Sequence, residues 1–305
     1  MEKVANKKEV YLLLLMVVIL WGVNTVSIKY LTQFFPPTIL ASIRMILASS
    51  FLFTVFLCKT KQRKLPKAAW GATAGVAISC IFLHQIALTI GLKETSSTHA
   101  TLILGLGPLF TTVLASFFLR EPFTLAKGLG IFLGLCGIGL IVVGKSQSGS
   151  TLLGDGITCI AALTFAIGSL FVKKAVLNSS SLAVTAYSHT LAAIGLTAFN
   201  LLLYPVSDYA ASPMNGTILF VLLFSSFMST AVGALLWNMS IHKVGASTAA
   251  LFQNASPIFG IFAAALFLGE TLRWQYFFSL LLISGGVILG TGILSLPSSH
   301  DKKNL

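Results

Sequence analysis

Long apolar runs, separated by short polar or charged breaks, make up most of this chain. A helix needs about 20 mostly apolar residues to cross roughly 30 Å of bilayer hydrocarbon. Runs of that length occur ten times, so the pattern predicts ten transmembrane helices. They are expected at Val10–Leu31, Thr38–Cys58, Ala68–Ile90, Ser97–Leu119, Leu125–Gly144, Gly154–Ala175, Leu182–Tyr204, Met214–Ser240, Ala246–Leu268 and Trp274–Leu294.

One of these apolar runs occurs twice. The stretch Ala100–Glu121 reappears about 149 residues later as Ala249–Glu270, and the two align without a gap. Because chance seldom pairs both a proline and a glutamate within one apolar run, we interpret the match as an internal duplication. The identical pairs are Ala100 and Ala249, Leu102 and Leu251, Pro108 and Pro257, Phe110 and Phe259, Ala115 and Ala264, Phe118 and Phe267, Leu119 and Leu268, and Glu121 and Glu270.

The duplication divides the ten predicted helices into two copies of five. Because five is odd, the second copy enters the membrane in the direction opposite to the first. Inverted repeats that meet near the bilayer midplane are typical of secondary transporters, which open a shared central site to each side in turn. The sequence therefore predicts an all-α integral membrane protein with two inverted five-helix repeats, at residues 10–144 and 154–294, around a central cavity.

The composition agrees with a membrane protein. Charged residues make up 9% of the chain and the mean hydropathy is +0.92, whereas a soluble domain carries about 25% charged residues. A net charge of +12 in a soluble protein would suggest nucleic acid, but here the basic residues lie in short segments between spans. We therefore expect a lipid bilayer around the chain and no nucleic-acid partner. The four cysteines follow no metal-binding spacing, so no metal or other cofactor is predicted.

The basic residues also predict the orientation. If the N-terminus is cytoplasmic, fifteen Lys and Arg residues fall on the cytoplasmic side and four, Lys29, Lys93, Lys145 and Arg273, on the other. Such an excess is typical of cytoplasmic segments. We expect a multi-pass protein of the cytoplasmic membrane with both termini inside. The fifteen are Lys3, Lys7, Lys8, Lys59, Lys61, Arg63, Lys64, Lys67, Arg120, Lys127, Lys173, Lys174, Lys243, Lys302 and Lys303.

Motifs in both halves resemble the EamA family of the drug/metabolite transporter superfamily. The resemblance covers about residues 10–294 and implies ten helices and the movement of small metabolites, often amino acids. The second copy departs from the pattern, because its opening lacks the WGxN of the first. The matching residues are Trp21-Gly22-x-Asn24, Lys29, Pro36-Pro37, Arg44, Pro108 and Leu119-x-Glu121 in the first copy, and Pro257 and Leu268-Gly269-Glu270-Thr271 in the second.

Polar side chains at membrane depth usually face a cavity or another helix, so they are the candidate substrate-binding residues. Asn24 can hydrogen-bond a substrate and Trp21 can stack on one, or both can serve helix packing. Arg44 lies within a span without a carboxylate in any span to neutralise it. It can attract a substrate carboxylate or phosphate, or it can hold the scaffold together.

The other candidates lie in the third, eighth and ninth predicted helices. His84 and Gln85 can bond a substrate, and the histidine can relay a proton. Trp237 is expected in a gate or as an interface anchor. Gln253 and Asn254 come just before Pro257, which leaves a backbone carbonyl without its partner one turn earlier. We expect these two amides to form a binding wall.

The duplicated prolines and glutamates are interpreted as scaffold. Pro108 and Pro257 are expected to act as hinges, and Glu121 and Glu270, which end their helices, as loop anchors. Acidic residues occur only at the termini, in loops or at span ends. Proton coupling through a midplane carboxylate is therefore not expected, and neither is a strongly cationic substrate.

These features predict a secondary transporter of a small metabolite, foremost an amino acid or related compound, working in export by alternating access. The first alternative is a nucleotide-sugar or sugar-phosphate antiporter of the same superfamily, which would need several basic residues at depth. A membrane-embedded enzyme would need clustered His, Asp or Glu, and the sequence has no such set, so no catalytic residue is assigned. Whether the protein is a monomer or a homodimer stays open.

Overall fold

The computed structural model describes residues 7–60, 64–118, 125–143, 150–205, 214–245, 249 and 252–291. Every regular element in these ranges is helical. The first half comprises α1 (Lys7–Leu31), α2 (Pro37–Lys59), α3 (Lys67–Gly75), η1 (Val76–Leu83), α4 (His84–Glu94), α5 (Ser97–Leu104), α6 (Gly107–Phe118) and α7 (Leu125–Val143). The second comprises α8 (Leu152–Asn178), α9 (Ser181–Leu203), α11 (Gly216–Leu223), η2 (Phe224–Val232), α12 (Gly233–Val244), α14 (Ser256–Leu268) and α15 (Trp274–Thr291).

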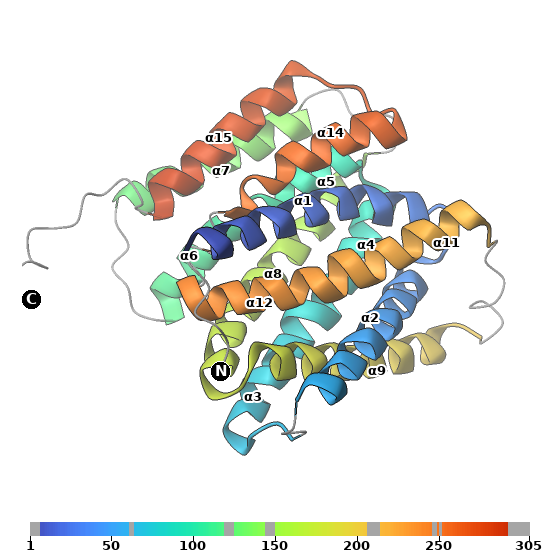
Figure 1. The fold of residues 1–305 in the computed structure, drawn as a ribbon. Coiled ribbons are helices and arrows are strands. Elements are labelled where there is room, and N and C mark those ends of the chain that lie inside the picture. The colour runs from blue at the N-terminus through green and yellow to red at the C-terminus, as the bar shows by residue number, and fades with distance from the viewer. Residues whose placement is uncertain are drawn as a thin grey trace, which may run out of the picture.

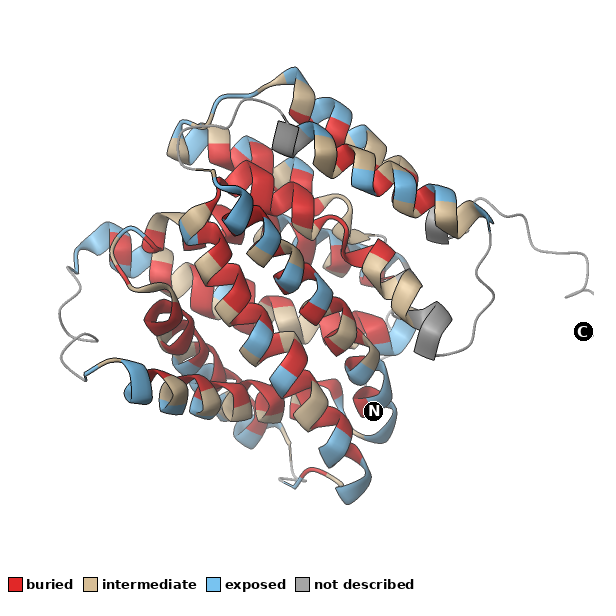
Figure 2. Cartoon of the chain, turned by 180° about the vertical axis from the view of Figure 1, so that it is seen from behind, coloured by how far each residue is buried: buried red, intermediate tan, exposed pale blue. Residues whose placement is uncertain are grey.

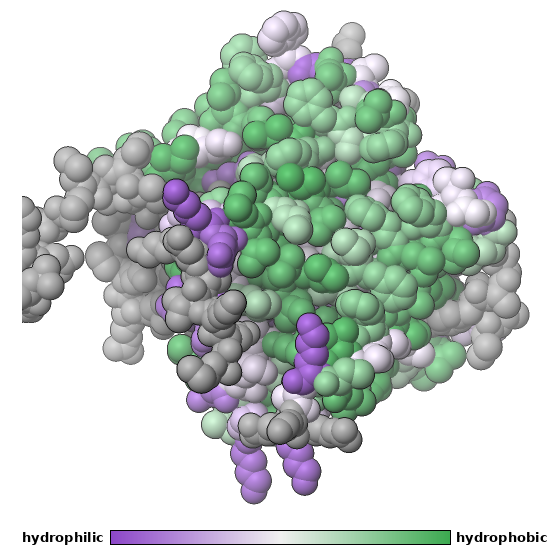
Figure 3. Space-filling view, in the orientation of Figure 1, coloured by the Kyte–Doolittle hydropathy of each residue, from purple (hydrophilic) through white to green (hydrophobic). Residues whose placement is uncertain are grey.

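Six helical segments of the described chain are long and apolar enough to cross a membrane, and each coincides with a predicted span. The other described apolar helices are shorter, so the total of ten spans stays a prediction. The six are Lys8–Leu31, Pro37–Lys59, Lys67–Glu94, Leu152–Asn178, Ser181–Leu203 and Gly216–Val244. In Figure 3 the visible face is mostly hydrophobic, and the strongly hydrophilic side chains gather toward its edges. Such a surface suits lipid.

Helix packing follows the duplication. α2 packs on α9 and α7 packs on α15, so two helices of the first copy each contact their own counterpart in the second (Figure 1). The first helix of each copy is α1 or α8, and α14 corresponds to the pair α5 and α6. The contact of α1 with α14 therefore has its counterpart in the contact of α8 with α5 and α6. In the same way α4 corresponds to α12, so the contact of α4 with α8 has its counterpart in the contact of α12 with α1. The described helices thus pack as two related halves around a shared centre.

Local irregularities also occur in pairs. The third and eighth predicted helices each contain a wide π-type segment, η1 and η2, about 148 residues apart. The predicted helix Ser97–Leu119 is divided into α5 and α6 by a tight turn at Gly105 and Leu106. Since Pro108 has no N–H to donate and its ring crowds the preceding turn, the chain tightens there. The corresponding turn in the second copy falls at Asn254 and Ala255, before Pro257.

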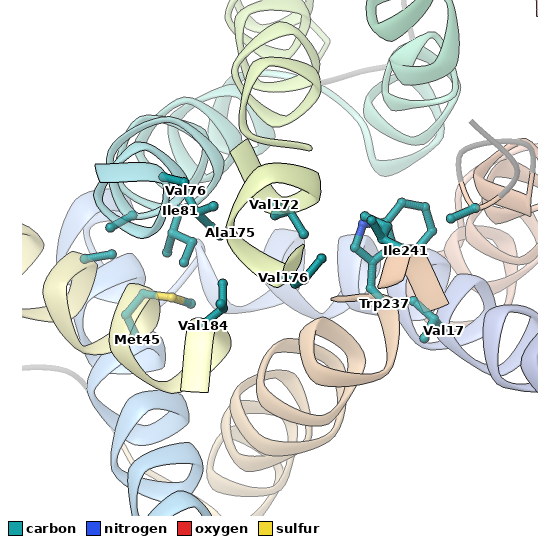
Figure 4. Close-up of a cluster of buried hydrophobic side chains, with 14 of the residues drawn as sticks. Val17, Met45, Val76, Ile81, Val172, Ala175, Val176, Val184, Trp237 and Ile241 are labelled. Atoms are coloured by element: carbon teal, nitrogen blue, oxygen red, sulfur yellow. The ribbon is translucent and has the colours of Figure 1, made fainter. Parts of the chain in front are cut away.

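The largest buried apolar cluster lies where η1, α8, α9 and α12 meet (Figure 4). Val76 and Ile81 from η1 face Val172 and Val176 from α8, and Trp237 extends the cluster toward α1. Buried residues are concentrated where helices pack on one another, and exposed residues lie toward the outside of the bundle (Figure 2). This core fixes the helices that surround the candidate site.

Candidate functional site

A cavity of about 120 Å³ lies in the middle of the bundle. Its walls come from both copies: α1, η1, α4 and α5 of the first, and α8, α9, η2 and α12 of the second. The tight turn before α6 and the residues just before α14 complete it. The cavity therefore lies where both copies and both helix breaks meet. The candidate residues that line it are Trp21, Asn24, His84, Gln85, Trp237 and Gln253.

The remaining candidates lie elsewhere. Arg44 and Asn254 do not line the cavity, and neither do Pro108, Pro257 and Glu270. Asn254 Oδ1 is buried and has no hydrogen-bond donor in the described chain. Of the two amides before Pro257, the structure thus brings only Gln253 to the cavity wall. Glu121 lies outside the described residues.

Aromatic rings form one part of the cavity wall. Trp21 packs edge-on against Phe165 with ring centroids 5.5 Å apart, and it lies 5.0 Å from Trp237. The Trp21 indole N–H donates to the backbone oxygen of Ser229 over 3.0 Å, which fixes the ring between two copies of the repeat. Such a wall offers an apolar surface with defined ring faces.

Arg44 lies next to the polar part of the wall, outside the cavity. Its side chain is fully buried, yet its charge has no acidic partner within the described residues. Three hydrogen bonds hold it: Nε donates to Ser225 Oγ over 2.7 Å, Nη1 to Gln85 Oε1 over 2.9 Å and Nη2 to Thr230 Oγ1 over 2.8 Å. Ser225 in turn donates to Asn24 Oδ1 over 2.6 Å. The buried guanidinium of Arg44 therefore holds two cavity-lining amides, Gln85 directly and Asn24 through Ser225.

Two histidines line the same cavity. His84 Nδ1 lies 2.9 Å from the backbone oxygen of Ala161, and His189 Nδ1 lies 2.9 Å from that of Thr185. Because a carbonyl only accepts, each Nδ1 must carry the hydrogen, and in the neutral ring Nε2 is then an acceptor. The two rings thus add hydrogen-bond acceptors to the cavity wall, beside the two amides whose oxygens are held by the network of Arg44.

The helix break before α6 lies directly against the side chain of Gln253. A Cβ placed on Gly107 would lie 2.9 Å from Gln253 Oε1, so a larger residue there would push the amide aside. In the sequence Gln253 corresponds to Leu104, which has no polar group. The amide therefore makes the two breaks, which lie against each other at the cavity, chemically different.

Near the predicted outer ends of the helices a second polar cluster holds the turn between α4 and α5. Lys29 Nζ donates to the backbone oxygen of Thr95 over 2.6 Å, and Asp155 accepts from the Thr95 hydroxyl. The carboxylate of Glu270 accepts from the backbone N–H groups of Ser97 and Thr98 at 2.8 and 3.0 Å. Negative charge at a helix N-terminus is stabilising, so these contacts anchor the start of α5 to α1, to α8 and to the segment that follows α14.

Sequence reasoning missed several of these residues. Ser225, Ser229 and Thr230 interrupt an apolar run, and their spacing places them on one side of a helix facing Arg44 and Trp21. That polar spacing was a usable signal. Phe165 corresponds to Trp21 at a spacing of about 144 residues, but an aromatic residue in an apolar run looks like any packing residue.

An all-helical bundle of repeats with a shared central cavity defines a class of integral membrane transport proteins. The chain belongs to the EamA-like transporter family, whose model matches it twice, at residues 8–143 and 152–291. This protein is therefore a multi-pass membrane transporter. The family match confirms the resemblance that the motifs indicated; the repeat bounds 10–144 and 154–294 stay predictions.

Named relatives cover nearly the whole chain. An uncharacterized transporter of Bacillus subtilis, YyaM, is 26% identical over 300 residues, which is 96% of this chain and 97% of the relative. A probable amino-acid metabolite efflux pump of Salmonella typhimurium is 28% identical over 291 residues, or 93% of this chain and 95% of that one. A solved crystal structure matches with a TM-score of 0.69 at 16% identity, covering 95% of this chain and 99% of its own, and shows the same fold.

Proposed function

We propose that this protein is a secondary transporter that exports an amino acid or a related small metabolite across the cytoplasmic membrane by alternating access. The observation that carries the proposal is the central cavity, which combines an aromatic wall with amide and imidazole groups and is built by both copies of the repeat. A compound with both polar and apolar parts fits such walls.

The helix breaks supply the moving parts of the proposal. Breaks in transmembrane helices beside a central site are where transporters change shape, and their free backbone groups are tolerated only where protein or a cavity covers them. Pro108 and Pro257 each follow such a break. Under this proposal the two prolines are hinges, and Trp21, Asn24, His84, Gln85, Trp237 and Gln253 are the residues that contact substrate.

Relatives give independent support for the substrate class. Two of them, 28% identical to this chain, are described as probable amino-acid metabolite efflux pumps of Salmonella typhimurium and Escherichia coli. The alternative, a nucleotide-sugar or sugar-phosphate antiporter, fits less well. A phosphate site would need free basic groups in the wall, whereas the guanidinium of Arg44 already donates hydrogen bonds to three side chains. An enzyme fits less well, because the family model and the relatives are those of transporters.

A flux measurement tests the proposal. The purified protein is placed in liposomes loaded with a panel of amino acids, nucleosides, sugars and sugar phosphates, and radiolabelled uptake by exchange is measured. Exchange of one or more amino acids above protein-free liposomes is expected. Exchange of sugar phosphates alone would support the alternative, and no exchange of any compound would end the transporter proposal for this panel.

A further inference from the structure

The hydrogen bonds around Arg44 determine which way two cavity amides point. Arginine carries only donors, so the atom of Gln85 at 2.9 Å from Nη1 must be the amide oxygen. That assignment leaves Gln85 Nε2 without an acceptor among the described residues. Gln85 lines the cavity, so its NH2 group is the part left to bind a ligand.

The same reasoning extends to Asn24 through Ser225. Ser225 Oγ accepts from Arg44 Nε and, being fully buried, needs an acceptor for its one hydrogen. It finds this acceptor in Asn24 Oδ1 at 2.6 Å. Asn24 Nδ2 is then the atom without an acceptor among the described residues, and Asn24 also lines the cavity. Both amides thus offer the cavity donors and keep their oxygens turned to the arginine.

A third donor belongs to the same cavity. Trp237 is 4% exposed, and its indole Nε1 is buried without a hydrogen-bond acceptor in the part of the chain that the structure describes. A buried N–H without an acceptor is unfavourable, because it has lost its bond to water. Trp237 lines the cavity, so its indole N–H is a third candidate donor for a ligand that carries acceptor atoms.

The positive charge behind these donors has the matching sign. Arg44 is fully buried, and its recorded partners are a glutamine, a serine and a threonine, all neutral. Removing a charge from water is costly unless an opposite charge compensates it. An anionic group bound at the two amides would place the missing negative charge one side chain away from the guanidinium.

We propose that Asn24 Nδ2 and Gln85 Nε2 form a carboxylate subsite of the cavity, and that Arg44 is the positioning residue that sets its specificity. The subsite rests on the proposed function and deepens it: the transported compound carries a carboxylate, bound by the two amides. The arginine does not touch the substrate. It fixes both amide oxygens and supplies the electrostatic field.

Matched ligand pairs test the subsite. Leucine, valine, methionine and phenylalanine are each compared with the corresponding amino alcohol as inhibitors of exchange in proteoliposomes, with whichever compound the flux panel finds as the labelled substrate. Since a hydrogen bond to a charged group is stronger than one between neutral groups, inhibition by the acids is expected at concentrations at least about tenfold lower than by the alcohols, which equals about 1.4 kcal/mol. Equal inhibition by acid and alcohol overturns the subsite.

Gln85→Glu is the sharpest variant. Its carboxylate still accepts from Arg44, so folding is preserved, but an oxygen replaces the Nε2 donor and repels a bound carboxylate. We expect the preference for acid over alcohol to fall by at least about tenfold, while inhibition by the alcohol is kept. The exposed Gln33 provides the matched control, since Gln33→Glu adds the same charge away from the cavity. A Gln85→Glu protein with the wild-type preference contradicts the proposal.

Ser225→Ala tests the hydrogen-bonded link from Arg44 through Ser225 to Asn24 without removing the arginine. It frees the Asn24 amide to turn and is expected to reduce the acid preference less than Gln85→Glu does. A purely structural role of the network would lower the yield of folded protein and leave the ratio of acid to alcohol unchanged. If the panel shows transport of a substrate without any carboxylate, the subsite is wrong although the transporter proposal stands. If it shows no transport at all, the proposed function itself fails.

Discussion

His99 Nδ1 lies 3.2 Å from the Oδ2 oxygen of Asp155, and both side chains are buried between α5 and α8. The Thr95 hydroxyl donates to the other carboxylate oxygen. Asp155 therefore joins the start of α8 to the turn that precedes α5. A buried carboxylate that accepts from two neighbouring side chains stabilises a helix contact outside the lining of the central cavity.

Removing the Asp155 carboxylate should destabilise the fold. Asp155→Ala leaves the Thr95 hydroxyl and His99 Nδ1 without their acceptor, and each buried group left unsatisfied costs about 1–3 kcal/mol. Asp155→Asn keeps one acceptor oxygen and should cost less. Thermal melting of the detergent-solubilised protein, followed by size-exclusion chromatography, measures the order: wild type, then Asn, then Ala. Equal melting temperatures for all three would show that the cluster contributes nothing to stability.

Close contact between α1 and α14 depends on one glycine. A Cβ added to Gly22 would lie 2.7 Å from the backbone oxygen of Ser256 and 2.9 Å from the backbone nitrogen of Gly260. Backbone atoms cannot move aside as a flexible side chain does, so Gly22→Ala should cost about 1–3 kcal/mol through overpacking. The same melting experiment measures the loss.

Gly156→Ala is the matched control for that substitution. Gly156 lies in a helix too, but a Cβ there would meet nothing within 4 Å. Alanine favours helix by up to about 1 kcal/mol over glycine, so this variant should melt at or above the wild-type temperature. A Gly22→Ala protein that melts like Gly156→Ala would contradict the close packing of α1 on α14.

The sequence alone predicts the helices well and their side-chain partners poorly. The span expected at Thr38–Cys58 matches α2, Pro37–Lys59, because a long apolar run between charged breaks has one stable form in lipid. Arg44 shows the limit. Its partners Ser225 and Thr230 lie 181 and 186 residues away along the chain, and only the packing of α2 on η2 brings them together. No local pattern distinguishes an arginine that binds substrate from one that holds other side chains in place.

The break between α5 and α6 shows an intermediate case. Pro108 marked an irregularity in the sequence, but the predicted element was a single helix from Ser97 to Leu119. The structure places the tight turn at Gly105 and Leu106, where backbone N–H groups bond three residues back. How far a helix reforms after a proline depends on what packs there, and here Gln253 from the second copy lies beside Gly107.

Labelling of single cysteines tests the predicted orientation. In a background with the four native cysteines replaced by serine, cysteine is introduced at Gln33 or at Lys64, both of which are exposed. If both termini are cytoplasmic, an impermeant maleimide should label Gln33→Cys in intact cells and Lys64→Cys only after the cells are broken. The physical basis is the excess of basic residues on the predicted cytoplasmic side. The reverse labelling would invert the orientation.

Trp21 should govern the apparent affinity of transport rather than stability alone. Its ring packs on Phe165 and Trp237 in the cavity wall. Trp21→Phe keeps a ring in this place, although it loses the hydrogen bond to the Ser229 oxygen, whereas Trp21→Leu removes the aromatic face. For Trp21→Phe we expect KM to rise by no more than about threefold. For Trp21→Leu we expect KM to rise by about tenfold, which equals about 1.4 kcal/mol. Initial rates of exchange in proteoliposomes measure both values.

Trp70 separates a cavity effect from a general loss of tryptophan. It lies in α3, is 41% exposed and packs on Tyr187 outside the cavity. Trp70→Leu should therefore leave KM within about twofold of the wild type, because it changes no surface that a substrate contacts. If Trp70→Leu and Trp21→Leu raise KM equally, the aromatic wall is not part of the substrate site. If Trp21→Leu lowers only the amount of folded protein at an unchanged KM, Trp21 packs the bundle without touching substrate.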